Sequence, residues 1–148
     1  MPIAREQNSI IKRCISENGA RAITHYEVIN RNSEIFKNVQ NTQIYTKSVQ
    51  NFDIINHNLG ISEDLEIVKC LLETGRTHQI RVHFAAIGHP LLGDTLYGSA
   101  SSLIARQALH AYQITFFHPI TKKRVCYVAP IPNDFNAFFQ KRSCSKIS

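Results

Sequence analysis

The sequence ETGRTHQIRVHFAAIGHP, residues 73–90, decides how the rest of the chain must fold. An apolar run that reads as a strand ends at Leu72, and Gly75 then turns the backbone. Thr77 can cap a helix, and Gly88 is a typical stop signal. The pattern therefore predicts a strand, a turn and a helix that ends near Gly88.

Apolar residues cover both sides of this predicted helix: Ile80, Phe84 and Ile87 on one, Val82, Ala85 and Ala86 on the other. A helix that is apolar nearly all round is buried, yet this one contains Arg81. Removing the partner of a buried charge costs about 3–5 kcal/mol. We therefore expect Arg81 to face a carboxylate or a phosphate, in a structural salt bridge or in an active site.

Length and composition predict one soluble domain that spans residues 1–148. The chain is 43% hydrophobic and 19% charged, which is ordinary for a globular protein. Its net charge of +6 favours a polyanionic partner, RNA or DNA. A merely basic soluble protein is the alternative interpretation.

The cysteines and the hydropathy pattern indicate a cytoplasmic protein. Four cysteines are present, far apart and without a C-x-x-C pair, so neither a zinc site nor a disulfide framework is indicated. No apolar run is long enough to span a membrane. The N-terminus lacks the apolar region of a signal peptide. We expect reduced thiols and no membrane partner.

The remaining sequence predicts an α+β fold, with a mixed, mainly antiparallel sheet around the buried helix. Strands are expected at residues 20–29, 65–72, 108–117 and 124–129. The N-terminal isoleucines Ile10, Ile11 and Ile15 favour one or two helical turns, and residues 99–107 read as a polar connector with a possible short helix. Pro132 opens a last amphipathic helix with Phe135, Phe138 and Phe139. At least one sheet edge should lack a partner in this chain.

Residues 30–62 differ in character from the flanking sequence. They are rich in asparagine and poor in apolar residues. We interpret them as an insertion, with a small hairpin of residues 44–46 and 52–55 as the alternative. Residues 141–148 are basic and polar and are expected to form a flexible tail.

The sequence contains no pattern typical of a metal or cofactor site. His78 and His83 are five residues apart, whereas two zinc ligands on a helix prefer a spacing of four, and no Glu lies between them. There is no nucleophile elbow and no glycine-rich phosphate loop. Asp94 follows Gly93 in a tight loop and is expected to bond nearby backbone amides.

Several segments in order resemble the C-terminal signature of the Rlu-type pseudouridine synthases, the ribosomal large-subunit family. They are residues 2–5 and 19–26, then TGRTHQIRVH at 74–83, GHP at 88–90, GD at 93–94, LYG at 96–98, RQALHA at 106–111, FHP at 117–119 and APIP at 129–132. The resemblance covers most of the chain outside residues 30–62, and a motif string of this length is very specific.

The resemblance implies a largely antiparallel sheet around a central cleft, and conversion of uridine to pseudouridine in RNA without metal or cofactor. In this family an aspartate of an H-R-L-D segment acts on the target nucleoside, and a tyrosine stacks on the target base. Neither segment is present in these 148 residues. Arg81 corresponds to the cleft arginine that pairs with that aspartate.

The resemblance also suggests contacts with RNA. Arg76, His78 and Gln79, at the start of the predicted helix, could contact phosphate or the displaced strand. Helix capping and local hydrogen bonding is the alternative for all three. Basic residues farther along could follow the RNA backbone or simply be solvated: Arg106, Lys122, Lys123 and Arg124.

Three hypotheses result. In the first, the chain is the C-terminal part of an Rlu-type catalytic domain, inactive without a missing N-terminal half, and its substrate is rRNA or tRNA. In the second, it is a non-catalytic RNA-binding remnant. In the third, which we rank last, it is a stand-alone fold in which Glu73 or Asp94 pairs with Arg81.

Overall fold

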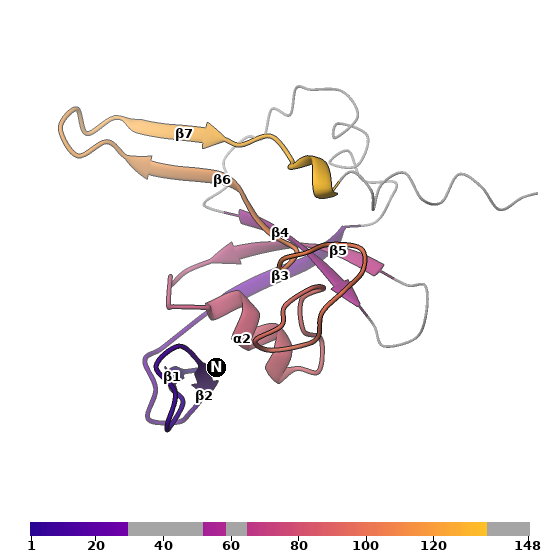
Figure 1. Cartoon of the computed structure of the whole chain (residues 1–148). Helices are drawn as coiled ribbons and strands as arrows, with labels where there is room; N and C mark the ends of the chain where they lie inside the picture. Colours follow the sequence, from indigo (N-terminus) through magenta and orange to yellow (C-terminus); the bar gives the residue numbers. More distant parts are fainter. Residues whose placement is uncertain (30–51, 59–64, 136–148) are drawn as a thin grey trace, which may run out of the picture.

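The computed structural model describes residues 1–29, 52–58 and 65–135 of the chain. Within these ranges the strands and the helix follow one another as β1 (Ile3–Arg5), β2 (Arg13–Ile15), β3 (Thr24–Ile29), β4 (Phe52–Asn58), β5 (Leu65–Leu72), α2 (Gln79–Ala86), β6 (Leu109–Phe117) and β7 (Arg124–Val128). The expected α+β class with a mainly antiparallel sheet and a buried helix is confirmed (Figure 1).

The main sheet has five antiparallel strands in the order β3-β5-β4-β6-β7. Strand β4 lies at its centre, between β5 and β6. The interpretation of residues 30–62 as an insertion is therefore wrong for Phe52–Asn58, because a central strand cannot be removed without dividing the sheet. The companion segment of the alternative hairpin, residues 44–46, lies outside the described residues.

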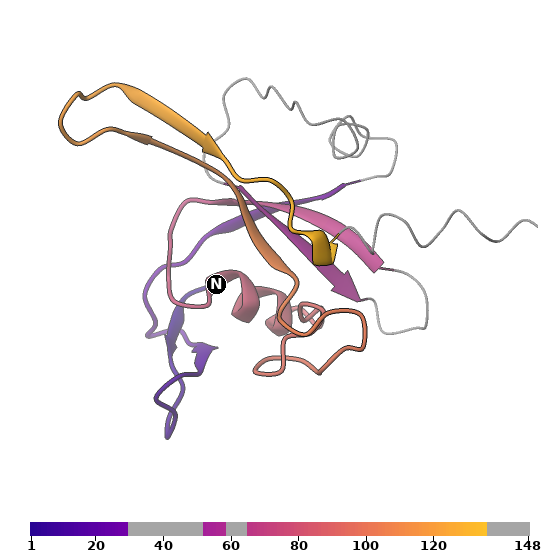
Figure 2. The same cartoon turned by 45° about the horizontal axis from the view of Figure 1, so that its top comes forward.

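Helix α2 lies between the main sheet and the N-terminal strands (Figures 1 and 2). One cluster of buried residues joins β5 to the helix and the loop after it: Val68, Cys70, Ile80, Phe84 and Leu91. On the other side Val82 packs against Ile3 and Ala22. Because apolar groups surround the helix on two sides, its charged residue must find its partner inside the fold.

A second core cluster covers the other end of the sheet. It contains Ile29, Ile67, Leu92, Ile104, Ala108, Tyr112 and Phe135. Ile67 belongs to this cluster and its neighbour Val68 to the cluster at α2, as expected for successive strand residues that point to opposite faces. Residues 133–135 are helical, where the last helix was expected to begin. Phe138, Phe139 and the predicted tail lie outside the described residues.

The N-terminal segment is a small two-stranded sheet. Strand β1 pairs with β2, with Ile3 opposite Ile15 and Arg5 opposite Arg13. The expected helical turns at Ile10, Ile11 and Ile15 are therefore wrong. Ile10 lies in the connection between the two strands and is 86% exposed, so the apolar spacing there does not mark a buried helix face.

The start of α2 differs from the prediction, whereas its end agrees with it. Thr77 does not cap the helix: the N-cap is His78, which has φ 57° and makes no side-chain capping bond. Gly88 has φ 84°, which suits a glycine after a helix. The predicted strands at 65–72, 108–117 and 124–129 are present, and the strand at 20–29 is reduced to Thr24–Ile29. In the described part of the chain, every helix is too short or too polar to traverse a lipid bilayer.

Gly93 fixes the loop that follows α2, and its replacement should be costly. Its φ is 72°, and a Cβ there would overlap the carbonyl oxygen of Arg106 and lie 2.9 Å from Ile104 Cγ2. Gly88→Ala has the unfavourable φ but open space, and should cost about 1–2 kcal/mol. We expect Gly93→Ala to lower the free energy of unfolding by more than Gly88→Ala, as measured by urea denaturation.

The matched control is Gly75→Ala, because no heavy atom lies within 4 Å of the added Cβ and its φ is not positive. That variant should stay within about 0.5 kcal/mol of the wild type. If Gly93→Ala and Gly75→Ala lowered the free energy of unfolding by the same amount, Gly93 would not be the residue that fixes this loop.

Candidate functional site

Arg81 on α2 is paired with Asp94, which lies in the loop after the helix. The guanidinium donates two hydrogen bonds, from Nε to Oδ2 at 2.8 Å and from Nη2 to Oδ1 at 2.7 Å. The Arg81 side chain is 13% exposed and the Asp94 side chain 0%. This is a bidentate, nearly buried ion pair, the geometry in which arginine and carboxylate interact most strongly.

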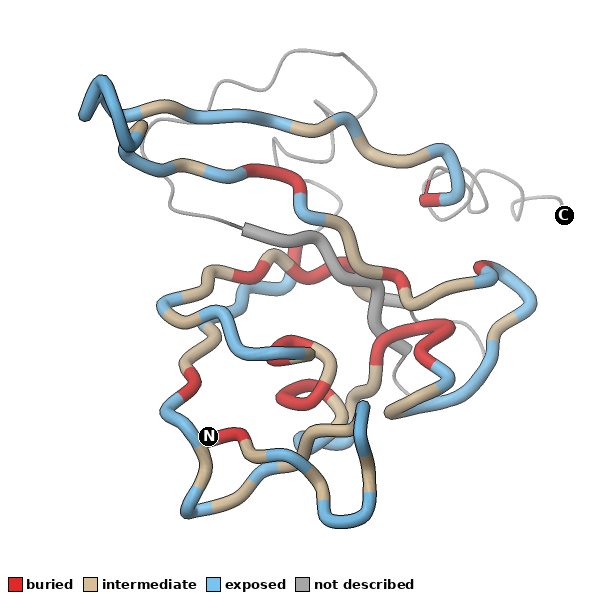
Figure 3. The backbone as a smooth tube through the Cα atoms, turned by 60° about the vertical axis from the view of Figure 1, so that its left-hand side comes forward, coloured by how far each residue is buried: buried red, intermediate tan, exposed pale blue. Residues whose placement is uncertain are grey.

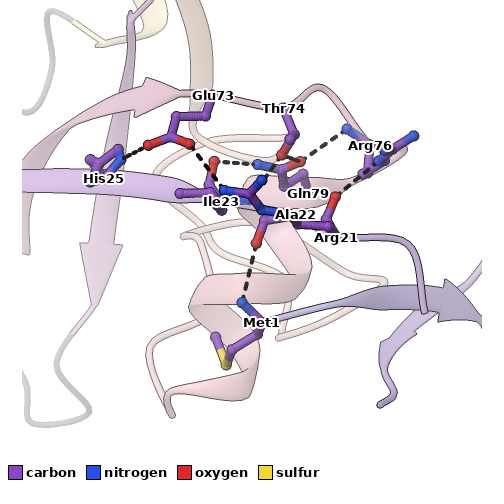
Figure 4. Close-up of polar contacts among 9 residues, drawn as sticks. All are labelled: Met1, Arg21, Ala22, Ile23, His25, Glu73, Thr74, Arg76 and Gln79. Carbon is purple, nitrogen blue, oxygen red and sulfur yellow. Dashed lines mark hydrogen bonds and ion pairs between the residues drawn. The ribbon is translucent and has the colours of Figure 1, made fainter. Parts of the chain in front are cut away.

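The first hypothesis placed the carboxylate partner of Arg81 on a segment outside this chain, but Arg81 has a carboxylate partner within the chain. Asp94 occupies the position that the third hypothesis gave to Glu73 or Asp94. Glu73 faces elsewhere: its Oε1 lies 2.6 Å from His25 Nε2, and its Oε2 lies 3.8 Å from Arg21 (Figure 4). Among the described residues, Nη1 of Arg81 has no hydrogen-bond acceptor, so one edge of the guanidinium is not used by Asp94.

Asp94 also accepts two backbone hydrogen bonds, from the N–H groups of Leu96 at 3.1 Å and Tyr97 at 3.2 Å. The predicted contact of Asp94 with nearby amides is thus confirmed, in addition to its ion pair. Burial alone would raise the pKa of Asp94. The hydrogen bond and charge of Arg81, with the two amides, outweigh burial and hold that pKa below its ordinary value. The hydrogen bond to Asp94 in turn raises the pKa of Arg81.

Tyr97 connects this pair to two other parts of the chain. The Arg81 guanidinium lies over the Tyr97 ring, with Cζ 5.0 Å from the centroid, a cation–π arrangement. The Tyr97 hydroxyl accepts the backbone N–H of Arg13 at 2.8 Å and lies 2.9 Å from His78 Nδ1. One tyrosine therefore links strand β2, the start of α2 and the ion pair.

The surroundings of His78 favour the neutral form of its imidazole. Because the Tyr97 hydroxyl accepts a hydrogen bond from Arg13, it can donate its own proton to His78 Nδ1. Burial lowers the pKa of His78, and the positive charges of Arg81 and Arg13 lower it further. A neutral imidazole beside Arg81 adds no second positive charge to the site.

Gln79 has a structural role. It is 3% exposed. Its Oε1 accepts hydrogen bonds from the Thr74 hydroxyl at 2.8 Å and the Arg76 N–H at 3.0 Å. Its Nε2 donates to the Ile23 carbonyl at 2.9 Å and to the Thr24 hydroxyl at 3.0 Å (Figure 4). All four bonding positions of the amide are used, so local hydrogen bonding explains Gln79 and we do not retain it as an RNA contact.

Arg76 is the exposed member of the predicted RNA-binding group. Its Nε donates to the Arg21 carbonyl at 3.2 Å, which directs the guanidinium along the surface at the start of α2 (Figure 4). Arg76 and His78 both precede the buried Gln79 at the start of α2. In the sequence analysis His83 was tested only as a metal ligand. In the structure its Nε2 lies 2.8 Å from the Met1 carbonyl oxygen, and its Nδ1 lies 3.0 Å from the Thr24 hydroxyl oxygen.

The described residues contain no group of three His, Cys, Asp or Glu side chains able to hold a metal ion. Within the same residues, Cys14, Cys70 and Cys126 are not in disulfide bonds. The site is therefore built from an arginine, its aspartate, a tyrosine and a histidine. Its chemistry is the orientation of an anion by a fixed guanidinium.

Sequence reasoning identified Arg81 and named Asp94 as its partner only in the hypothesis ranked last, and it missed Tyr97. The LYG segment that contains Tyr97 was noted only as part of a motif. A single signal could have identified both residues: a buried arginine needs a carboxylate, and the glycine-bracketed loop 93–98 contains one beside an aromatic ring that can lie under the guanidinium.

Comparisons with known proteins agree with the resemblance. The profile of a family described as RNA pseudouridylate synthase matches residues 2–86. The "Uncharacterized RNA pseudouridine synthase YjbO" of Bacillus subtilis is 38% identical over 91% of this chain and 37% of its own length. The "Ribosomal large subunit pseudouridine synthase D" of Nitrosomonas europaea is 33% identical over 94% of this chain and 34% of its own.

A solved structure is also similar. The "Human RNA Pseudouridylate Synthase Domain Containing 1" matches with a TM-score of 0.55 and 25% identity, over 88% of this chain and 46% of the human chain. The present chain spans only about a third of the length of the two bacterial relatives.

Replacing Asp94 should destabilise the fold strongly. Asp94→Asn turns an amide N–H group toward the guanidinium and leaves a nearly buried positive charge unpaired. We expect a loss of about 3 kcal/mol in the free energy of unfolding at pH 7. The matched control is Asp134→Asn, because Asp134 forms the same two-bond pair with Arg106 but both side chains are 39% exposed. That loss should stay below about 1 kcal/mol.

The same variant should change the dependence of stability on pH. Because the pKa of Asp94 lies lower in the folded state than its ordinary value of 3.8, the pair stabilises the wild type above that pH. The stabilisation is lost as the pH falls through the folded-state pKa. The gap between wild type and Asp94→Asn should therefore narrow below about pH 4. A gap that stays constant in urea titrations from pH 7 to pH 3 would exclude an ionised, paired Asp94.

Proposed function

This chain belongs to the RNA pseudouridylate synthase family, and we propose that it supplies the arginine side of a catalytic site that converts uridine to pseudouridine in RNA. Arg81 carries the proposal. By the resemblance it corresponds to the family's cleft arginine, and it is nearly buried and held by Asp94 and Tyr97, while its Nη1 has no hydrogen-bond acceptor among the described residues. A guanidinium held in this way can receive a second carboxylate without rearranging the first.

The family's chemistry explains why such an arginine is needed. An aspartate acts on the target nucleoside, and the uracil is detached, turned and rejoined through carbon. The product is an isomer of uridine, and the hydrogen displaced from that carbon passes to solvent. Arg81 would orient the aspartate and keep it ionised. The target base must leave its stack to reach such a site.

We propose that the aspartate comes from polypeptide outside these 148 residues, since no H-R-L-D segment occurs in them. The relatives, of which this chain matches about a third, are long enough to contain both parts. The partner is then the rest of the same catalytic domain. On this proposal the 148-residue chain has no pseudouridine synthase activity alone.

The substrate, the RNA contacts and the compartment are proposed on narrower grounds. The name of the Nitrosomonas relative refers to the ribosomal large subunit, which favours rRNA over tRNA.

Arg76 and His78 lie just before Gln79, the first residue of α2, and we assign them to contacts with the RNA. The free, exposed thiol of Cys126 is compatible with a reducing compartment, and we place the protein in the cytoplasm.

A second candidate function is RNA binding without catalysis. The pair with Asp94 favours it, because the charge of Arg81 is already balanced within this chain. Such a remnant would bind RNA with strong salt dependence and would not isomerise uridine under any condition.

A chimera tests the first proposal. The part of the 38%-identical relative that this chain does not match is joined to residues 1–148, and tritium release is measured from RNA that contains uridine labelled at carbon 5. We expect turnover by the chimera and none by the 148-residue chain. Arg81→Lys in the chimera should lower the rate by about a hundredfold or more, since lysine cannot keep the two-bond geometry.

The matched control is Arg106→Lys in the chimera, because Arg106 also binds an aspartate through two bonds but at the surface. That variant should retain the rate within about twofold. Turnover by the isolated chain would refute the split site. A folded chimera that binds RNA but releases no tritium would favour the second candidate.

A further inference from the structure

The β6–β7 hairpin extends away from α2 and from the N-terminal strands (Figures 1 and 2). Strand β6 pairs with β4 only from Leu109 to Gln113. Beyond that point, Ile114–Phe117 pair with β7 alone. Among the described residues, the outer part of the hairpin therefore has no further strand beside it, and most of it is exposed (Figure 3).

One face of this outer part is aromatic. Ile114 lies opposite Tyr127, and Phe116 lies opposite Val125, so the four side chains share a face. We call these four residues the aromatic face. The Phe116 and Tyr127 rings are stacked, with centroids 6.0 Å apart and an interplanar angle of 28°. They remain 40% and 59% exposed, so a further flat ring could extend the stack.

The turn beside this face is basic. Lys122, Lys123 and Arg124 are all exposed, and residues 109–128 contain no Asp or Glu. Backbone bonds fix the turn: His118 N–H donates to the Lys123 carbonyl at 2.8 Å, and Lys122 N–H donates to the His118 carbonyl at 2.9 Å. Lys122 and Lys123 are thus presented on an ordered turn at the end of the hairpin that contains the stacked rings. Arg124 is the first residue of β7 and lies opposite Phe117, so its side chain points to the other face.

We propose that the aromatic face and the basic turn together bind single-stranded RNA, with bases stacked on Phe116 and Tyr127 and phosphates bound by Lys122 and Lys123. This inference rests on the proposed function, because it takes RNA as the substrate and adds a surface distinct from the Arg81 site. Aromatic platforms beside cations are the usual means of binding unpaired nucleic acid without strong sequence preference.

The charge pattern favours RNA over a polypeptide. A strand of another polypeptide could cover the aromatic face, but it would leave the two turn lysines unmatched unless it were acidic. RNA supplies flat bases and phosphates in one ligand. The excess positive charge of the whole chain, +6, acts in the same direction.

The test measures fluorescence anisotropy of a labelled single-stranded RNA of about 12 nucleotides, within the range of sites on such platforms, titrated with the 148-residue chain over a range of KCl concentrations. The variant Phe116→Leu with Tyr127→Leu keeps apolar bulk but removes the π-faces. It should weaken binding about tenfold with an unchanged salt slope. Lys122→Gln with Lys123→Gln should instead reduce the slope of log K against log salt by about 0.7 for each phosphate that is no longer neutralised.

The matched control is Arg5→Gln with Lys12→Gln, which removes two charges from the β1–β2 segment and should change affinity by less than about twofold. Circular dichroism melting of each variant checks the fold. Should the leucine variant not fold, the glutamine variant decides alone, because its residues are exposed in a turn.

The outcomes separate this inference from the proposed function. If the wild-type chain bound no RNA even at low salt, that result would contradict both the proposed function and this inference. A wild-type chain that binds RNA, with hairpin variants no weaker than the control, would overturn this inference and leave the proposed function standing. Unchanged RNA affinity in the leucine variant, with loss of a protein–protein association, would assign the aromatic face to a polypeptide.

Discussion

The pairing of a buried guanidinium with a buried carboxylate is the constraint on which the rest of this structure depends. A helix with apolar surroundings on two sides cannot contain Arg81 unless the charge is met inside the fold. Asp94 meets it, and the loop that contains Asp94 is held by the backbone conformation of Gly93 and by two amide hydrogen bonds. Tyr97 then ties the same loop to strand β2. The N-terminal segment, the helix and the loop therefore form one unit around a single charge.

This unit also explains how one residue can be structural and chemically available. Asp94 uses Nε and Nη2 of Arg81, and the Tyr97 ring lies against the guanidinium. Burial and the positive charges of Arg81 and Arg13 lower the pKa of His78 beside them, which disfavours a second positive charge there. The arginine is oriented before any ligand arrives, so a second anion would meet a group that has little conformational freedom left to lose.

Sequence alone predicted the parts of the fold whose signals are local. Strands β5, β6 and β7 follow from apolar patterning between glycine and proline, and the end of α2 follows from Gly88. The signals failed where distant residues decide. Thr77 is the better cap by propensity, yet the bond between His78 and Tyr97 fixes a left-handed residue there. The spacing of Ile10, Ile11 and Ile15 resembles that of a helix face. The segment instead pairs as two strands, and the backbone N–H of Arg13 donates to the Tyr97 hydroxyl. The partner of Arg81 lies across a loop whose path the sequence does not reveal.

The strand order has a consequence for the order in which the chain can assemble. Strand β5 lies between β3 and β4, so among the described strands β3, although synthesised earlier, has no pairing partner until β5 is present. Strands β4 and β5 meet across a short connection, from Asn58 to Leu65, whereas Ile29 must wait for Ile67. Loop-closure entropy favours the nearer pair first. During synthesis strand β3 would therefore remain unpaired until β5 emerged. Helix α2, which contains Arg81, is the next element after β5 and would pack against the sheet as soon as β5 had joined it.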